Sequence, residues 1–260
     1  MSKPHTFQTP AVIIKKTRLG EADVIFTLYT PHLGKIQGIA KSVRKTASRL
    51  AGHLELLTYS QVTLARGKNL DTIIGSQTIN SFLPLKSNLE LISCGLYLLE
   101  LINQFTPDET SDPGLFDLVL TSLEHLARGA DCQMLLRHFE MRLLRHAGYH
   151  PELAHCVACQ KPLEERGAAL FALSAGGLIC INCNQAKGHR GYGLSPNALH
   201  LMRLLQAGEW QDIDQIVVDD TPLREVQRLM QSYIRSILER DIRSAAWLVT
   251  IEQSSIYAQR

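Results

Sequence analysis

Two pairs of cysteines constrain this chain of 260 residues more than any other feature. Cys156 and Cys159 form one C-x2-C pair, Cys180 and Cys183 form another, and 20 residues separate the pairs. Two intervening residues let both sulfurs of a pair face one point across a tight turn, and two such pairs complete the tetrahedral thiolate shell that Zn²⁺ prefers. The sequence therefore predicts one zinc ion bound by these four cysteines.

Four thiolates fill the coordination shell of the metal and leave no position for water or a substrate. The predicted zinc ion is therefore structural rather than catalytic. His155 and His189 lie close enough in the sequence to replace a cysteine, but we expect both to lie outside the metal shell. An iron–sulfur cluster remains an alternative for four cysteines, although paired spacings favour zinc.

No segment of the sequence indicates export or a membrane. The first residues, Met-Ser-Lys-Pro-His, have no apolar stretch behind their charge, and the apolar runs are shorter than the ~20 residues that a membrane helix needs. We expect a cytoplasmic protein. In that compartment thiols stay reduced, so paired cysteines indicate a metal rather than disulfides.

The first 80 residues contain short β-rich runs separated by turn residues. Val24, Phe26 and Leu28 alternate with other residues at period two, and Leu19-Gly20 is one of the turns. Five strands with one longer link predict an OB-type barrel, and an SH3-like barrel fits nearly as well. The expected strands cover residues 11–17, 24–30, 34–40, 56–65 and 71–80.

From about residue 86 the hydrophobic period becomes helical, and the first helix is expected to end near Phe105. Three later helices are expected to begin with a capping residue followed by proline, which fits the first helical turn. These pairs are Asp112-Pro113, Ser195-Pro196 and Thr221-Pro222. The later helices are expected over residues 113–128, 131–147, 196–206 and 222–239.

The predicted fold class is α+β with several domains. An N-terminal OB-fold β-barrel precedes an α-helical bundle, and a four-cysteine zinc module is inserted into that bundle. The expected boundaries are 1–82 for the barrel, 83–152 and 194–260 for the two parts of the helical domain, and 153–193 for the zinc module.

Positive charge gathers in the N-terminal region. Residues 1–80 carry 11 Lys and Arg against 4 Asp and Glu, whereas residues 81–260 carry 16 against 21. A basic N-terminal region on a mildly acidic body indicates a polyanion partner, because each phosphate that is neutralised releases counterions. The candidate DNA-binding residues are Lys15, Lys16, Arg18, Lys35, Lys41, Arg44, Lys45, Arg49, Arg66 and Lys68.

No common catalytic motif is present in the sequence. It lacks the phosphate-binding pattern G-x4-G-K-[ST], the dinucleotide pattern G-x-G-x-x-G and the nucleophile pattern G-x-S-x-G. We therefore expect a binding protein rather than an enzyme.

Several short segments, taken together and in order, resemble a known family. They resemble the bacterial RecO recombination mediators, and the set covers nearly the whole of this chain in the right order. The segments are Gly20-Glu21-Ala22-Asp23, Thr30-Pro31-His32-Leu33-Gly34-Lys35, Ala40-Lys41-Ser42-Val43-Arg44-Lys45, Leu96-Tyr97-Leu98-Leu99-Glu100-Leu101, Phe116-Asp117, Arg137-His138-Phe139-Glu140, Gly148-Tyr149, the cysteine pairs with Gly176-Gly177, and Ile242-Arg243-Ser244.

The resemblance implies a non-enzymatic function in DNA repair. A RecO protein is expected to bind single- and double-stranded DNA, anneal strands and, together with RecR, help the RecA recombinase displace single-strand-binding protein. Such a protein would be associated with the nucleoid. Because some RecO proteins lack the cysteines, the resemblance also implies a supporting role for the zinc.

The resemblance further implies that the helical body binds the acidic C-terminal tail of single-strand-binding protein. His138, Arg142 and Arg145 are spaced along one expected helix as a basic stripe, and Arg137 borders it. Arginine can bind a carboxylate through two hydrogen bonds. We hypothesise that Arg137, His138, Arg142 and Arg145 bind this tail, and a solvated helix edge is the competing interpretation.

Two other functions remain open at this point. A zinc-containing OB-fold factor of transcription or translation would bind RNA instead of DNA. An enzyme whose site is assembled from scattered residues would show no local motif at all.

Overall fold

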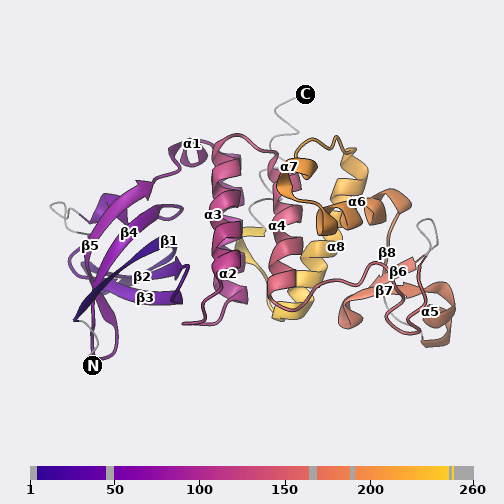
Figure 1. Ribbon diagram of the computed structural model, residues 1–260, viewed down its shortest axis with the longest axis horizontal. Helices are drawn as coiled ribbons and strands as arrows, with labels where there is room; N and C mark the ends of the chain where they lie inside the picture. Colours follow the sequence, from indigo (N-terminus) through magenta and orange to yellow (C-terminus); the bar gives the residue numbers. More distant parts are fainter. Residues whose placement is uncertain (1–4, 45–49, 164–168, 188–190, 246–247, 249–260) are drawn as a thin grey trace. The chain divides into compact units, whose positions relative to one another are not determined.

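The β-rich N-terminal segment forms a closed five-stranded barrel. In the computed structural model, which describes residues 5–44, 50–163, 169–187, 191–245 and 248, its strands are β1 (Thr6–Leu19), β2 (Asp23–Thr30), β3 (Gly34–Ala40), β4 (Tyr59–Ala65) and β5 (Asp71–Asn80) (Figure 1). Their order around the barrel is β1-β2-β3-β5-β4. All five expected strands are confirmed, and the arrangement is that of an OB-type barrel.

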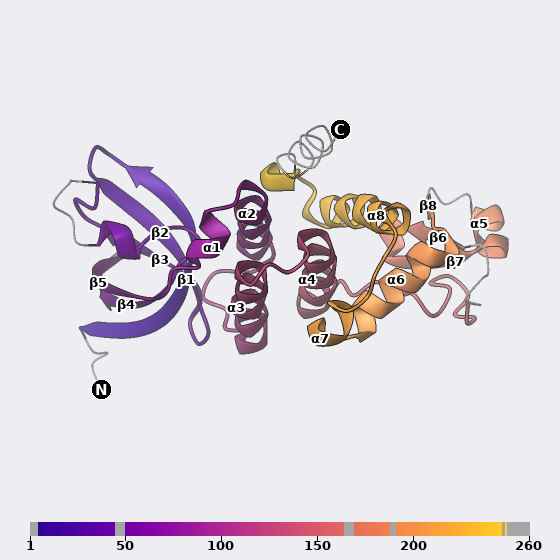
Figure 2. The same cartoon turned by 90° about the horizontal axis from the view of Figure 1, so that it is seen from above.

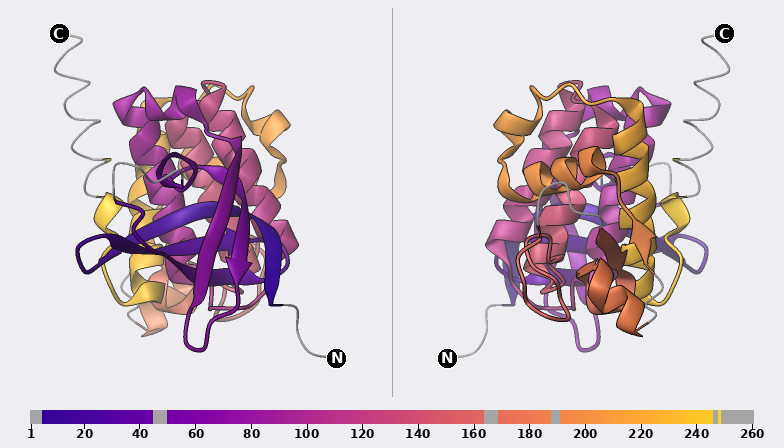
Figure 3. Two further views of the ribbon diagram at one scale, coloured as in Figure 1. Left: turned by 90° about the vertical axis from the view of Figure 1, so that its left-hand side faces the viewer. Right: turned by 90° about the vertical axis from the view of Figure 1, so that its right-hand side faces the viewer.

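The barrel closes through one narrow seam. β3 and β5 run parallel and are paired only at Gly38↔Asp71 and Ile39↔Thr72, whereas the other strand pairs are longer and antiparallel. Gly38 is needed at this place, because a β-carbon there would lie 2.9 Å from the side chain of Ile73. Figure 3 (left) looks onto the barrel from outside.

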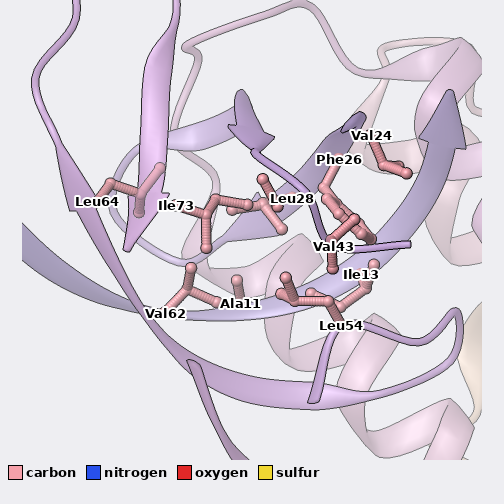
Figure 4. Close-up of a cluster of buried hydrophobic side chains, with 11 residues drawn as sticks. Ala11, Ile13, Val24, Phe26, Leu28, Val43, Leu54, Val62, Leu64 and Ile73 are labelled. Carbon is pink, nitrogen blue, oxygen red and sulfur yellow. The ribbon is translucent and has the colours of Figure 1, made fainter. Parts of the chain in front are cut away.

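Alternating apolar residues fill the barrel interior. Val24, Phe26 and Leu28 of β2 are buried on one face, as the period-two pattern predicts. Val43 and Leu54, from the link between β3 and β4, point into the same core (Figure 4). The core therefore fixes the inner face of each strand and leaves the alternate residues for the surface.

Two longer helices complete the first of two compact units, which includes the described residues up to Gly129. A short helix, α1 (Leu83–Lys86), leads to α2 (Leu89–Phe105), and α3 (Pro113–Ala127) follows. The Asn88 side chain caps α2, and the Asp112 carboxylate accepts a hydrogen bond from Leu115 N at 2.9 Å to cap α3. The expected cap of α3 is confirmed, while α1 was not predicted.

Lys35 of β3 joins the barrel to the end of α2. Its Nζ donates to the carbonyl oxygens of Asn103 at 2.9 Å and Thr106 at 2.7 Å, and it lies 3.3 Å from the Asp108 carboxylate. Carbonyl groups at a helix C-terminus lack partners within the helix and carry partial negative charge, so a lysine is favourable there. With only 11% of the side chain exposed, the ammonium group is committed to this contact.

The adjacent β2–β3 turn is fitted to the same segment. Glu109 N donates to Lys35 O at 2.9 Å, and the Ser111 hydroxyl donates to Pro31 O at 2.9 Å. Gly34 lies so close to the backbone of Thr110 that a side chain would overlap it, and its φ of +66° also favours glycine. The turn and residues 108–111 therefore form one interlocked contact.

The second unit, Ala130–Ala245, consists of helices and an inserted β-containing module. Its helices are α4 (Cys132–His146), α5 (Ile181–Lys187), α6 (Pro196–Ala207), α7 (Trp210–Ile213) and α8 (Asp220–Leu238), and its strands are β6 (Ala169–Ala172), β7 (Gly177–Cys180) and β8 (Tyr192–Gly193). α6 and α8 pack side by side and both contact α4 (Figure 2).

The expected helix starts in this unit are confirmed with one exception. Ser195 caps α6 through a hydrogen bond from Ala198 N. The predicted start at Thr221-Pro222 is wrong, because α8 begins at Asp220, with Asp219 in the capping position. Proline is tolerated in the first turn, where N–H groups have no partner within the helix. None of the helices in the described ranges combines the length and apolar character that crossing a membrane requires.

Replacing Lys35 by methionine is expected to lower the free energy of unfolding by about 2 kcal/mol, because the hydrogen bonds of a charged donor are lost while the aliphatic stem stays. Chemical denaturation measures this loss. Lys41→Met is the matched control, since Lys41 is exposed and surface changes usually stay within about 0.5 kcal/mol. Equal stability of the two variants would contradict the role of Lys35.

Candidate metal centre and nucleic-acid interface

The four predicted cysteine ligands converge in the second unit. The sulfur atoms of Cys156, Cys159, Cys180 and Cys183 all lie within 4.8 Å of one another. Cys159 Sγ and Cys180 Sγ are 4.0 Å apart. A tetrahedral zinc site with bonds of ~2.3 Å has sulfur–sulfur distances of about 3.8 Å. The cluster therefore has the size and the donor set of a four-thiolate metal site.

A hydrogen-bonded turn positions the first cysteine pair, and a strand end followed by a helix positions the second. In the first pair, Gln160 N donates to Cys156 O at 2.8 Å and closes the turn. In the second pair, Cys180 ends β7 and Cys183 lies in α5. Val157 N donates to Leu178 O at 2.9 Å and holds the two halves together.

Glu152 fixes the chain just before the first pair. One carboxylate oxygen accepts hydrogen bonds from the N–H groups of Ala154 at 2.8 Å and His155 at 2.9 Å. The hydrogen bond from His155, followed by that from Ala154, lowers the pKa of Glu152. Gly177 allows β7 to approach, because a β-carbon there would lie 2.8 Å from Glu152 O. The turn is therefore held in position by groups other than the metal ligands.

Two cysteines of the cluster have pKa values shifted in opposite directions. Burial raises the pKa of Cys156, but backbone N–H groups, first that of Cys180, outweigh it and bring the pKa to about 6. Hydrogen bonds to the sulfurs of Cys180 and Cys159 raise the pKa of Cys183 to about 12. Four sulfurs at this spacing can all lose their protons only when a cation balances their charge, so the donor set fits a metal ion.

Histidine does not take part in the cluster within the described residues. His155 Nδ1 lies 3.6 Å from a Glu152 carboxylate oxygen, and the group of potential ligands consists of the four cysteines. His189 lies outside the described residues.

Three side chains of α6 and α8 connect the cysteine module to the helices. They donate hydrogen bonds to carbonyl oxygens of residues 149–153, and they are Arg203, Gln206 and Tyr233.

A basic groove lies on the β1–β2 ribbon of the barrel. The strand register shifts between Ile13 and Lys15, and beyond this bulge residues 15–19 are all exposed. Lys16 and Arg18 face the same side as their partners Phe26 and Val24. The cavity on this side has a volume of about 630 Å³. Its lining residues are Lys16, Arg18, Val24, Phe26, Val43, Arg44 and Ala51.

Arg44 is positioned in the groove by the turn between β1 and β2. One guanidinium nitrogen donates to Glu21 O at 2.8 Å, and Arg44 N donates to Ala22 O at 3.1 Å. Lys16 Nζ lies 5.7 Å from the centre of the Phe26 ring. Although the residue as a whole is exposed, partial burial of its ammonium group lowers its pKa, and the charge of Glu55 opposes this shift. Three cations therefore line an apolar floor, and none of the lining residues is acidic.

The other candidate DNA-binding residues fall into three groups. Lys15, Lys41 and Lys68 are exposed. Lys35 is committed to the end of α2, and Arg66 is paired with Asp71 at 3.0 Å and stacked on Phe7 at 4.0 Å. Lys45 and Arg49 lie outside the described residues. The structure thus brings together Lys16, Arg18 and Arg44, a grouping that depends on the strand register and was not evident from the run of charges.

The four residues of the expected basic stripe on α4 do not form a common exposed surface. Arg137 is buried and pairs with Glu140 at 2.7 Å, and His138 is buried with its ring 5.8 Å from that of Trp210. Arg142 donates to Gly208 O and to Glu209, both at 2.7 Å. Of the four residues only Arg145 is exposed. The prediction of a helix with one polar face is wrong for α4, because α6, α7 and α8 contact it.

Comparison with known proteins gives consistent matches over nearly the whole chain. The family profile described as "Recombination protein O N terminal" matches residues 1–82, and that described as "Recombination protein O C terminal" matches residues 86–246. A protein of Dehalococcoides mccartyi strain BAV1 named "DNA repair protein RecO" is 42% identical, with 98% of this chain and 100% of the relative covered. Another of the same name, from Roseiflexus sp. strain RS-1, is 34% identical, with 96% and 88% covered.

Freshly purified protein is expected to contain one equivalent of metal per chain, and elemental analysis measures it. Cys156→Ser or Cys180→Ser should abolish metal binding and expose the module to hydrogen exchange, because a structural site contributes to folding. His155→Ala is the matched control and should retain the metal. A metal-free wild type, or loss of metal in the histidine variant alone, would contradict the four-cysteine site.

Proposed function

Since this chain belongs to the RecO family of DNA repair proteins, we propose that it is a mediator of recombinational repair that binds DNA through the β1–β2 groove. The observation that carries this proposal is the groove itself. Lys16, Arg18 and Arg44 converge above an apolar floor that no acidic residue lines, and cations gathered in this way favour a polyanion.

The groove suits the nucleic-acid backbone better than the base edges. Its polar groups are three cations, which contact phosphate without reading sequence. Both single- and double-stranded DNA offer such phosphates, so the same face serves for both. Exposed Lys15, Lys41 and Lys68 extend the field that attracts DNA to the barrel.

The finer steps of the proposed function follow from the family rather than from this geometry. We propose that the protein anneals complementary strands, acts with RecR, and helps RecA load onto DNA that is coated with single-strand-binding protein. None of these steps requires bond-breaking chemistry, so we propose a binding function without catalysis. The protein would then work in the cytoplasm, at the nucleoid.

For the cysteine cluster we propose a structural zinc ion. The donor set consists of thiolates alone, and such a shell favours zinc and is closed to substrate. The hydrophobic cluster next to the cysteines is small, with Cys156, Ala172 and Ile179 as its buried members. Metal binding therefore supplies stability that this core cannot supply by burial alone.

For the tail of single-strand-binding protein we propose a smaller site than the sequence indicated. Arg145 is exposed near the C-terminal end of α4. Burial and then the charges of Arg145 and Arg142 lower the pKa of the nearby His150. Arg142 is already paired with Glu209 at 2.7 Å, so Arg145 is the exposed arginine of α4 that can bind a further carboxylate.

The DNA proposal is tested by Arg18→Glu/Arg44→Glu, with Arg128→Glu as an exposed control at the end of α3. The double variant should bind single-stranded DNA about 100-fold more weakly, because two charge-assisted contacts of ~1.5 kcal/mol each are lost. The slope of log K against log salt should become shallower by about 1.4. Fluorescence anisotropy over a salt series measures both.

The same assay separates DNA from RNA. Single strands of matched length and sequence are competed against each other, and the proposal expects a preference for DNA or none. A strong preference for RNA would favour a factor of transcription or translation. Unchanged affinity and salt slope in the double variant would place the binding face outside the groove.

The tail site is tested by titrating a fluorescent peptide with the acidic C-terminal sequence of single-strand-binding protein. Arg145→Ala should weaken binding about tenfold, the equivalent of one charge-assisted hydrogen bond of ~1.4 kcal/mol. Arg128→Ala is the control. If the two variants bind equally well, Arg145 is only a solvated residue at the helix end.

A further inference from the structure

One face of α8 carries a line of arginines. Arg224, Arg228 and Arg235 are all exposed. At 3.6 residues per turn they fall within about 40° of one another around the helix. The opposite face is buried and includes Val226, Leu229 and Tyr233. The arginine line therefore points away from the core of the second unit.

The acids near this line leave its middle open. Glu225 accepts hydrogen bonds from Ser195 N at 2.6 Å and Ser195 Oγ at 2.7 Å, so its carboxylate is directed toward α6. Arg224 pairs with Asp220 at 3.2 Å and Arg235 with Asp241 at 2.9 Å, and no carboxylate in the described part of the chain is paired with Arg228. A mixed-charge solvated helix would instead alternate acids and bases along its face.

The two ion pairs at the ends of the line are too weak to keep a phosphate from binding Arg224 and Arg235. In the Arg235–Asp241 pair 69% and 73% of the two side chains are exposed. Exposed pairs of this kind contribute little and are screened by salt. A phosphate can therefore compete for Arg224 and Arg235 as well as for Arg228. Arginine is also the side chain best suited to bind phosphate through two hydrogen bonds.

An exposed aromatic ring lies beside the line. Tyr192 of β8 is 42% exposed, and its hydroxyl is 2.9 Å from Ser232 Oγ of α8. Tyr192 and Arg235 line one cavity of about 570 Å³ together with Arg240 and two acids, Glu239 and Asp241, so the unpaired positive charge of the line lies at Arg228, one turn before Ser232. A ring fixed next to cations is what single-stranded nucleic acid uses for base stacking beside phosphate contacts.

The cysteine module positions this ring. β8 pairs with β6, with Phe171 opposite Tyr192. β6 in turn pairs with β7, which ends at Cys180. Phe171 packs edge-on against Tyr233 of α8, with the ring centres 5.2 Å apart. The module thus presents Tyr192 to α8 from a folded support.

We propose that Arg224, Arg228 and Arg235 of α8, with Tyr192, form a second contact for single-stranded nucleic acid, separate from the β1–β2 groove. Successive arginines are about 6 Å and 10 Å apart along the axis, so the line can follow a phosphate backbone. A protein with two such contacts holds two strands at once. This inference rests on the proposed function and gives strand annealing a structural basis.

The first test counts the strands that one chain binds. Two oligothymidines with different fluorophores cannot pair with each other, so coincident binding reports two sites. Wild-type protein at saturation should bind two strands per chain, and mass photometry supplies the number of chains in the complex. Arg228→Glu should bind one, while Arg128→Glu, with the same charge change at the end of another helix, should still bind two.

The outcomes separate this inference from the proposed function. Wild type that saturates at one strand, or Arg228→Glu that still binds two, would overturn the α8 contact while leaving the groove intact. Wild type that binds no strand would refute the proposed function itself. Arg18→Glu/Arg44→Glu should keep one strand, held by the α8 contact alone about 100-fold more weakly than the groove holds its strand in wild type, and adding Arg228→Glu should remove that strand.

A second pair of variants tests the ring without changing charge. In the background of Arg18→Glu/Arg44→Glu, Tyr192→Ser should weaken the remaining strand about tenfold, in line with the loss of one stacked base. Tyr192→Phe keeps the ring and should stay within about twofold of the parent. If both substitutions weaken binding equally, the hydroxyl contact to Ser232 rather than base stacking accounts for the loss, and the stacking part of the inference is wrong.

Discussion

A lysine ammonium group at the end of a helix determines how the first unit is assembled. Lys35 lies on β3, and the carbonyl oxygens that it binds belong to Asn103 and Thr106. Those oxygens need a donor because α2 has ended, and the ammonium needs acceptors because it is largely buried. One contact meets both needs and also joins the barrel to the helices. Basic residues of the barrel are therefore divided between holding the fold and facing solvent.

The second unit combines two kinds of support. Ordinary helix packing holds α4, α6 and α8, whereas the inserted module has only a few buried residues around its cysteines. A metal ion suits such a module because thiolate coordination stabilises it without a large core. Arg203 and Tyr233 add hydrogen bonds from the helices, and Glu152 holds the turn before the first cysteine pair. The module is therefore a support that presents neighbouring surface residues.

Local patterns predicted the elements better than the sites. Strand alternation, the caps Asp112 and Ser195, and the cysteine spacing depend on neighbouring residues, and the structure agrees with each. The burial of Arg137 depends on elements that pack around α4 from elsewhere in the chain, and helical periodicity contains no such information. Lys35 and Arg44 are both basic residues of the N-terminal region, and the sequence does not distinguish their roles. In the structure Lys35 binds the end of a helix, whereas Arg44 lines the groove.

The narrow β3–β5 seam has a consequence for how the barrel forms. β1, β2 and β3 are joined by short turns, as are β4 and β5, so each of these sets can pair early. Closing the ring requires β1 to meet β4 and β3 to meet β5, across the longest separations in the barrel. The β3–β5 contact contains only two residue pairs, so its formation gains little pairing energy. Ring closure at this seam is thus the late, entropically costly step, and the same seam is where the finished barrel should open first.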